Sequence, residues 1–122
     1  MALRRAVLGD PHVDQALARA RAFGAEFDEF ITRYAWGEIW GRPGLPLRTR
    51  SLLTLSMLIA LNRMEELQMH VRGAVANGVT RQEITEVLLQ AAIYCGVPAA
   101  NAAVRATAQV FAALDDEESL LR

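Results

Sequence analysis

The sequence predicts an all-α fold of about six helices in a single domain spanning residues 1–122. Apolar residues recur at steps of three and four along most of the chain, as the buried face of an α-helix requires. No sustained alternation of apolar and polar residues occurs, and no Asn-Gly turn joins β-branched runs, so strands and hairpins are not expected. Glycine, proline and capping residues divide the chain into segments of helical length.

Two helices are expected before the first long loop. Asp10 followed by Pro11 reads as an N-cap with proline at the first helical position, and this helix is expected to end near Gly24. The second is expected over residues 25–40. The apolar residues at helical spacing in and just before this segment are Phe23, Phe27, Phe30, Ile31 and Tyr34. The next stretch, GRPGLPL, holds two glycines and two prolines and is therefore a loop.

Two helices are expected in the middle of the chain. The segment 47–61 is apolar nearly all round, which indicates a central position in the bundle. Asn62 should end it. The following helix, residues 63–77, stops at Asn77-Gly78, a typical C-terminal signal.

The last two helices also have clear start signals. Thr80 to Glu83 reads TRQE, a capping box, and opens a helix that runs through Cys95. Pro98 opens the final helix, which is expected to end near Leu114. The acidic tail beyond it is expected to fray.

Composition excludes several classes of function. All 13 basic residues are arginine, so Schiff-base and pyridoxal phosphate chemistry, which need a lysine amine, are not available. Cys95 is the only cysteine, which rules out an intramolecular disulfide and any Cys-x-x-Cys motif. No glycine-rich phosphate-binding loop is present, so neither flavin nor nicotinamide is expected. We therefore expect no cofactor.

Charge and hydropathy indicate the partners and the compartment. The formal charge of −1 gives no general attraction to nucleic acid or to an anionic membrane. The most apolar run, residues 52–61, is too short to span a bilayer, and the N-terminus lacks a continuous apolar signal region, so a cytoplasmic protein is expected. Apolar residues make up 52% of the chain, which favours a homo-oligomer with apolar subunit contacts.

The helix expected over residues 63–77 carries the most informative polar pattern. One stripe at steps of three and four is apolar and consists of Leu67, Val71 and Ala74. The neighbouring stripe consists of Arg63, Glu66, His70 and Gly73. It is either an exposed ion-pair face or an acid–base site. A metal site is less favoured, because the only other histidine, His12, lies near the terminus.

Arginine and tryptophan are also grouped. Five arginines fall between residues 42 and 77, namely Arg42, Arg48, Arg50, Arg63 and Arg72. Such a group suits an anionic ligand, since arginine binds carboxylates bidentately, although solubility and helix charge explain some of them. Trp36 and Trp40 stand four apart and form either a core pair or the wall of a ligand pocket. Cys95 is interpreted as a buried structural thiol.

Three motifs, YAWGEIWGRPGL, EELQMHVRGA and YCGVPAANAA, together carry a family resemblance that covers nearly the whole chain. The sequence resembles the carboxymuconolactone decarboxylase family, within the alkylhydroperoxidase D-like superfamily. The resemblance implies a helical bundle that assembles as a hexamer or trimer. It also implies a dicarboxylate lactone as substrate.

One departure from the superfamily changes the expected chemistry. Its redox members carry Cys-x-x-Cys-x-x-x-His, and the two cysteine positions fall here on Arg63 and Glu66, with an upstream glutamate position near Ser51. A single thiol cannot cycle as an intramolecular disulfide, so a redox role is disfavoured. The departure favours an acid–base site at His70 over a surface ion pair.

The implied reaction loses CO2 from a lactone that serves as its own electron sink. His70 is the candidate proton donor because an ordinary imidazole titrates near working pH, and Glu66 is expected to orient it and raise its pKa. The roles of His70 and Arg63 are interchangeable: an arginine would then face the dienolate oxygen while His70 only binds substrate. A non-catalytic, ligand-binding member of the same fold is the alternative.

The remaining site residues are assigned to substrate binding. Arg48 and Arg50 are the first choices for holding the two carboxylates, and Arg63 is next. Trp36 and Trp40 would supply an apolar wall that favours departure of neutral CO2.

Overall fold

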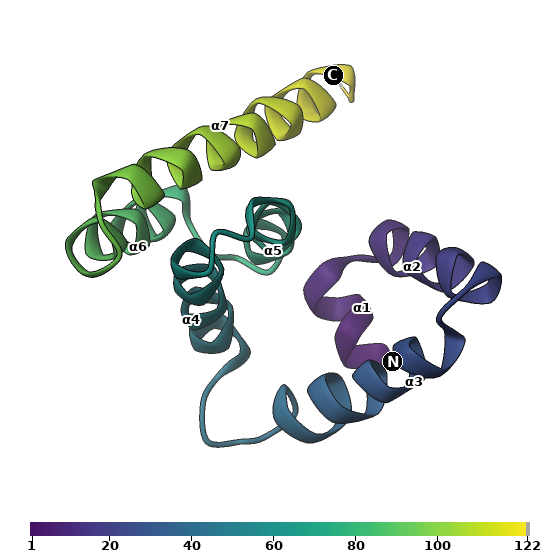
Figure 1. Ribbon diagram of the computed structural model, residues 1–122. Helices are drawn as coiled ribbons and strands as arrows, with labels where there is room; N and C mark the ends of the chain where they lie inside the picture. The colour runs from purple at the N-terminus through teal and green to yellow at the C-terminus, as the bar shows by residue number, and fades with distance from the viewer. Residues whose placement is uncertain (122) are drawn as a thin grey trace.

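The computed structural model describes residues 1–121, and in this range every regular element is helical (Figure 1). The elements are α1 (Ala2–Leu8), α2 (Asp10–Ala22), α3 (Ala25–Ile31), the π-helix η1 (Thr32–Ile39), α4 (Leu47–Ala60), α5 (Met64–Ala76), α6 (Arg81–Tyr94) and α7 (Val97–Leu120). The predicted all-α class is confirmed.

Helices α4 to α7 form the main core. Helix α5 packs against both α4 and α7, and α6 packs against the same two helices on another side (Figure 1). Leu67, Val71 and Ala74 of α5 are at most 1% exposed, so the apolar stripe expected on this helix is the buried one. The turns follow the sequence signals: Asn62 has a positive φ of 59°, and the Thr80–Glu83 capping box forms both of its hydrogen bonds.

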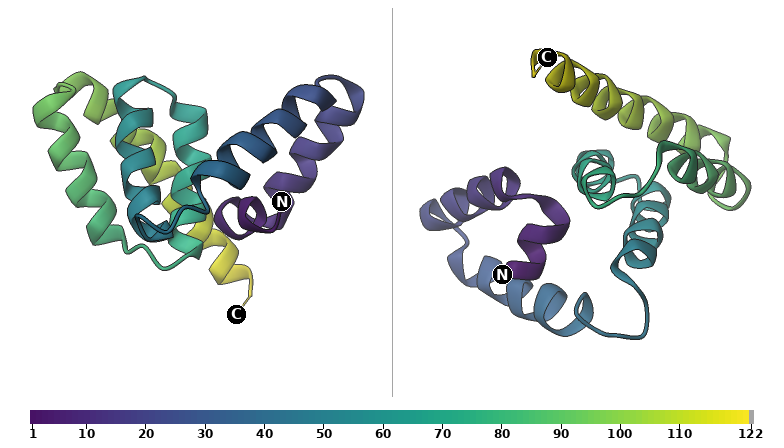
Figure 2. Two further views of the ribbon diagram at one scale, coloured as in Figure 1. Left: turned by 90° about the horizontal axis from the view of Figure 1, so that it is seen from below. Right: turned by 180° about the vertical axis from the view of Figure 1, so that it is seen from behind.

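Residues 2–39 form an N-terminal unit of α1, α2, α3 and η1, which extends to one side of the main core (Figure 2). It meets the core where α1 lies on α5. A Cβ atom on Gly73 would overlap the carbonyl oxygen of Val7, so the glycine allows the two backbones to touch. The Asn77 side chain donates to the carbonyls of Ala6 (2.8 Å) and Val7 (3.3 Å) and fixes the same contact.

The helix predicted over residues 25–40 is present, but its second half is a π-helix. The Trp40 N–H donates to the carbonyl of Ala35, five residues earlier, at 2.9 Å. Trp36 and Trp40 are buried in one cluster with Val7, Leu8 and Val13. The aromatic face read from the sequence is the exposed one: Phe23 is 92% exposed and Phe27 68%.

The start of the chain differs from the prediction. Helix α1 was not anticipated. Asp10 is not the N-cap of α2, because that position is Gly9, with a φ of 90°, and Asp10 is the first helical residue. Its carboxylate pairs with Arg5 at 3.0 Å, which ties α1 to α2.

The end of the chain also differs, since α7 runs to Leu120 and does not stop near Leu114. Two ion pairs hold the acidic turns in place. Arg81 of α6 pairs with Asp115 at 2.6 Å, and Arg72 of α5 pairs with Glu117 at 2.9 Å. The prediction of a frayed tail was wrong over residues 115–120 because these partners are distant in sequence.

Helix α4 is only partly central. Ser51, Leu55 and Ile59 are buried, whereas Met57 is 59% exposed and Leu61, just after the helix, is 68% exposed. One apolar face of this helix is therefore uncovered in the single chain. No helix in the described part of the chain is long and apolar enough to cross a membrane.

Candidate active site

The imidazole of His70 lies where the N-terminal unit meets the main core. Its ring stacks on Trp40 with a centroid distance of 6.2 Å and an interplanar angle of 12°. Trp40 in turn stacks on Trp36 at 4.8 Å. We call these three rings the Trp–His stack. Trp36 lies in η1 and Trp40 is the residue that caps its C-terminal end, whereas α5 carries the imidazole, so the stack joins the two parts of the fold.

The rest of the polar stripe on α5 runs outward from this stack. On one side of His70, Gly73 is covered by the backbone of α1. On the other side, Glu66 and Arg63 are exposed. Among the described residues, no hydrogen bond joins Glu66 to His70. The expectation that Glu66 orients the imidazole directly is therefore not supported by a contact.

The electrostatic environment of His70 differs from the prediction. The pKa of His70 is lowered to about 4, chiefly because burial disfavours the charged imidazole and secondly because of the charge of His12, whereas Glu66 has a smaller opposing effect. The imidazole is thus neutral at pH 7 in the free chain. The expectation of a pKa near working pH was wrong, because desolvation outweighs the carboxylate, although Glu66 does act to raise the pKa as expected.

Two of the five grouped arginines are bound to carboxylates. The Arg48 guanidinium pairs with the carboxylate of Glu83 and donates to the carbonyl of Gly78 at 3.2 Å, so it reinforces the start of α6. Arg72 is engaged with Glu117. The arginines that are grouped in the sequence lie on several elements: Arg42 in the loop after η1, Arg48 and Arg50 on α4, and Arg63 and Arg72 at the start and in the body of α5.

Two of the predicted arginines keep free donor groups. Arg50 donates to the carbonyl of Arg42 at 3.3 Å, and its buried Nε has no partner. Arg42 follows Trp40 by two residues, so this contact holds Arg50 at the loop beside the Trp–His stack. Arg63, at the exposed end of the stripe, makes no ion pair among the described residues. These two arginines remain available to an anionic ligand.

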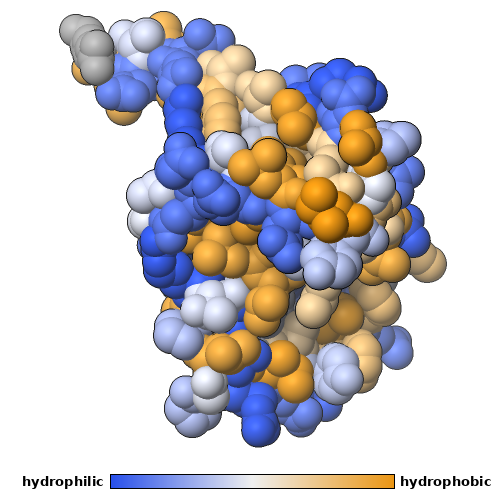
Figure 3. All heavy atoms as spheres, turned by 90° about the vertical axis from the view of Figure 1, so that its left-hand side faces the viewer, coloured by the Kyte–Doolittle hydropathy of each residue, from blue (hydrophilic) through white to orange (hydrophobic). Residues whose placement is uncertain are grey.

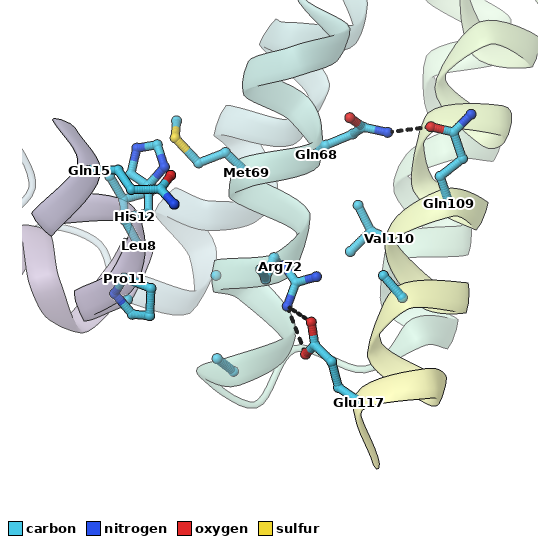
Figure 4. A pocket seen from close by; sticks show the side chains of 14 residues that line it. Leu8, Pro11, His12, Gln15, Gln68, Met69, Arg72, Gln109, Val110 and Glu117 are labelled. Carbon is cyan, nitrogen blue, oxygen red and sulfur yellow. Dashed lines mark hydrogen bonds and ion pairs between the residues drawn. The ribbon is translucent and has the colours of Figure 1, made fainter. Parts of the chain in front are cut away.

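Two large cavities lie between α2 and α5. One, of about 700 Å³, lies between the start of α2, α5 and α7, and its wall includes the Gln68–Gln109 hydrogen bond and the Arg72–Glu117 pair (Figure 4). The other, of about 670 Å³, is bounded by Arg4, Arg19 and Glu66 among others. His70 is partly buried, but it lines neither of these two cavities.

His12, which the sequence argument set aside, lines both cavities. Figure 4 shows Met69 of α5 extending toward it from the opposite wall. The charge of His12 is also one cause of the lowered pKa of His70. Burial, with Arg19 and Arg4 as further causes, lowers the pKa of His12. In the sequence, the Asp10-Pro11 helix start places His12 in the first turn of α2. Its position opposite α5 follows only from the packing of α1 on α5.

The remaining candidates from the sequence are the single thiol and a metal site. Cys95 is partly buried at the end of α6 and packs against the main core, consistent with a structural thiol. In the described part of the chain, no group of three or more His, Cys, Asp or Glu side chains is placed to hold a metal ion.

Comparison with known proteins decides the family. The model of the carboxymuconolactone decarboxylase family matches residues 25–109, which is more than half of the chain. The chain belongs to the carboxymuconolactone decarboxylase family. The match begins at α3 and takes in the complete Trp–His stack.

Three named relatives are similar to this chain over much of their own length. The chain is 48% identical over 109 residues to 4-carboxymuconolactone decarboxylase of Acinetobacter baylyi, covering 89% of this chain and 81% of the relative. It is 49% identical over 96 residues to nitrosuccinic acid decarboxylase of Metarhizium robertsii, covering 79% and 67%. A 38-residue stretch is 55% identical to 4-carboxymuconolactone decarboxylase of Pseudomonas putida, covering 31% and 79%.

Proposed function

We propose that this family member decarboxylates 4-carboxymuconolactone to 3-oxoadipate enol-lactone, a step of the β-ketoadipate route of protocatechuate degradation. The observation that carries the proposal is the 48% identity, over 89% of this chain, to a relative named for that reaction. The absence of lysine and of a dithiol agrees with chemistry that takes its electron sink from the substrate.

The reaction makes three demands on the site. The substrate is a dianion at neutral pH, and loss of the ring carboxylate as CO2 sends its electron pair through the conjugated C=C bond to the lactone carbonyl. The resulting dienolate oxygen needs a donor or a cation, and the α-carbon then takes up one proton. One proton is consumed in each turnover.

Arg50 and Arg63 are proposed to hold the carboxylates. Arg50 is supported by its buried, unpartnered Nε, since a substrate oxygen would satisfy a group that otherwise lacks a hydrogen bond. Arg63 is supported by its exposure at the open end of the stripe. Arg48 is a weaker candidate because Glu83 already neutralises it. Trp40 offers an apolar wall beside His70.

His70 is proposed as the acid–base group, which requires that its imidazole be protonated in the substrate complex. An imidazole with a pKa near 4 carries almost no proton at pH 7. A bound dianion favours the imidazolium, so the pKa of His70 rises when substrate arrives. The proton is then taken up in the complex and transferred to the α-carbon. Exposed Glu66 contributes a smaller favourable field.

A second substrate has specific support. The relative named for nitrosuccinic acid is about as similar as the lactone decarboxylase. Its substrate is also a dicarboxylate whose leaving carboxylate adjoins an electron sink, there a nitro group. The same arginines and acid–base group would serve both molecules, so substrate shape decides between them. A non-catalytic binding protein is the remaining alternative.

The functional unit is proposed to be a homo-oligomer. Figure 3 shows apolar side chains gathered among polar ones on the side of the molecule that carries α6. Ile93 and Tyr94 at the end of α6 are 77% and 80% exposed, and Val97 is 69% exposed. A second copy of the chain is the occupant favoured by the apolar composition.

The test is turnover of each substrate by the purified protein with a chelator present. We expect loss of the lactone's ultraviolet absorbance, release of one CO2 and uptake of one proton per molecule. Nitrosuccinate is assayed in parallel. Binding of the lactone without CO2 release would favour the non-catalytic alternative, and preferential turnover of nitrosuccinate would reassign the substrate.

The same assay tests His70. His70→Gln removes the acid–base group and should lower kcat by at least about a hundredfold, whereas Glu66→Gln should cost much less. Melting curves show whether each variant is folded. Near-normal kcat in a folded His70→Gln protein would remove His70 from the mechanism.

A further inference from the structure

We propose that Trp40 is a positioning residue for the reaction: the face of its indole holds the imidazole of His70 in the orientation in which it passes a proton to the substrate. The inference rests on the proposed decarboxylation, in which His70 is the acid–base group. It gives Trp40 a role that acts through His70, beyond that of an apolar wall beside the substrate. The observation that carries it is the stack between the two rings.

The imidazole of His70 needs such a partner. Among the described residues, no hydrogen bond reaches its ring, and Glu66, one turn earlier on α5, is exposed. The χ2 angle of a histidine has broad minima, so the side chain alone does not fix the plane of the ring. A displacement of about 1 Å can cost a reaction about a hundredfold in rate. A group that transfers a proton must therefore be oriented by some other contact.

The stack with Trp40 supplies this contact. The two ring centroids are 6.2 Å apart and the ring planes differ by 12°, an offset parallel arrangement within the usual range for aromatic pairs. Stacking restrains the plane of an imidazole but leaves both nitrogens free, because they lie in the ring plane and point away from its faces. An orienting carboxylate would occupy one of them. The indole therefore fixes the ring without blocking the uptake or release of a proton.

The same contact favours the charged form that the reaction needs. The imidazole is neutral at pH 7 in the free chain, and in the proposed mechanism it takes up its proton in the substrate complex. The face of an indole attracts a cation more strongly than the face of a phenyl ring does. Leucine is apolar but has no such face. An apolar wall and a positioning ring therefore predict different effects of substitution.

The fold holds Trp40 itself in place. The residue is 9% exposed, and its ring stacks on that of Trp36 at 4.8 Å with the planes 24° apart. Its N–H donates to the carbonyl of Ala35 at 2.9 Å, five residues earlier, as in a π-helix. Both indoles belong to the cluster that includes Val7 and Val13 of α1 and α2. Trp40 thus offers His70 a rigid surface.

The experiment compares Trp40→Phe, which keeps a ring face, with Trp40→Leu, which keeps only apolar character. We expect Trp40→Leu to lower kcat by at least about thirtyfold with KM changed less than about threefold, because orientation of the acid–base group is lost. Trp40→Phe should keep kcat within about fivefold, since a weaker ring face remains. If Trp40→Leu does not fold, Trp40→Met is the second variant without a ring.

Leu17→Ala is the control for lost packing. Leu17 lies on α2, which carries none of the three stacked rings, and it packs partly buried against the same cluster. The variant should lower the melting temperature but leave kcat within about twofold of wild type, because a cavity there costs stability and not orientation.

Proton NMR at pH 7 measures the stack without any need for activity. The ring current of an indole displaces the signals of an imidazole stacked on it, and His12→Gln leaves His70 as the only histidine, which assigns them. We expect the His70 signals to be displaced from those of the unfolded chain. The displacement should persist in part in Trp40→Phe and be lost in Trp40→Leu.

A double variant tests whether Trp40 acts through His70. Adding Trp40→Leu to His70→Gln should cost little further activity, because the two residues then act as a unit. The proposal is overturned if folded Trp40→Leu keeps kcat within twofold of wild type or matches Trp40→Phe. It is also overturned if the losses of Trp40→Leu and His70→Gln multiply, or if the wild-type His70 signals are not displaced. A wild-type protein that shows the displaced signals but decarboxylates neither substrate would instead overturn the proposed function.

Discussion

At the scale of single residues, the candidate site depends on which charged groups already have partners. Arg48 and Arg63 look equivalent in the sequence, but the first is bound to Glu83 and the second is exposed without an ion pair in the described chain. Glu66 lies beside His70 on the helix, yet burial decides the protonation of the imidazole. The role of each candidate residue therefore depends on whether its donors are already paired and on how far it is desolvated, and neither can be predicted from a sequence pattern.

The two arginines give a matched pair of variants. Arg63→Gln should raise KM for the lactone at least about tenfold with a smaller effect on kcat, because it removes a carboxylate contact made in ground and transition states alike. Arg48→Gln should leave KM within about twofold, since its guanidinium is held by Glu83. Steady-state kinetics on both variants check this. Equal effects on KM would show that the Arg48–Glu83 pair opens to bind substrate.

His70 also links stability to pH. Its pKa is lowered to about 4 in the folded chain, so the folded state binds fewer protons than the unfolded state between pH 6.5 and 4. The stabilising contribution is complete above the unfolded pKa of about 6.5 and is lost as pH falls. Between pH 6.5 and 5 the loss should be about 2 kcal/mol, and His12 acts in the same direction.

Urea unfolding at pH 7 and pH 5 measures this linkage. The wild type should lose more stability over the interval than His70→Gln, because the variant has no imidazole at that position to protonate. If both proteins lost the same amount, the low pKa of His70 would be contradicted.

At the scale of secondary-structure elements, the docking of α1 on α5 sets the geometry of the site. It covers Gly73, carries α2 and with it His12, and completes the cluster that buries Trp36 and Trp40. A helical Gly→Ala change ordinarily stabilises by up to about 1 kcal/mol. At Gly73 the sign should reverse, because the new methyl group would overlap the Val7 carbonyl.

We expect Gly73→Ala to destabilise the protein by about 1–3 kcal/mol, the usual cost of overpacking. Trp36 and Trp40 are the only tryptophans, so displacement of α1 should also shift tryptophan emission to longer wavelength. Gly37→Ala is the control, since a Cβ there meets the carbonyl oxygen of Thr32 at an ordinary 3.6 Å. A Gly73→Ala protein as stable as wild type would show that α1 does not bind α5 as described.

Most element boundaries could be predicted from the sequence, because their signals are local. Asn62, Gly78 and the Thr80–Glu83 box each act within one turn, and all three are where the sequence placed them. The misses have causes distant in sequence. The end of α7 depends on Arg72 and Arg81, and the π-helical turn at Trp40 depends on packing against α1 and α5. The place of His12 in the walls of both cavities arises in the same way, from the α1–α5 contact.

At the scale of the whole molecule, the single chain leaves apolar surface without a partner. Exposed apolar side chains follow the outer face of α6 and the start of α7, where Leu89 is 58% and Ile93 77% exposed. Phe23 and Phe27 of the N-terminal unit add a second group. Singly exposed apolar residues are common in monomers, but contiguous groups of this kind mark interfaces.

The final prediction tests that surface. Ile93→Glu places a charge in the middle of the α6 group and should shift the protein from an oligomer toward the monomer in light scattering at micromolar concentration, because an unpaired carboxylate is costly to bury. Ala18→Glu is the charge-matched control, as Ala18 is exposed on α2 and borders none of the cavities described. It should leave the assembly unchanged. If wild type were a monomer, the oligomer proposal would fail outright, whereas an oligomer unaffected by Ile93→Glu would move the interface to another face, with the exposed aromatic side chains of the N-terminal unit the next to test.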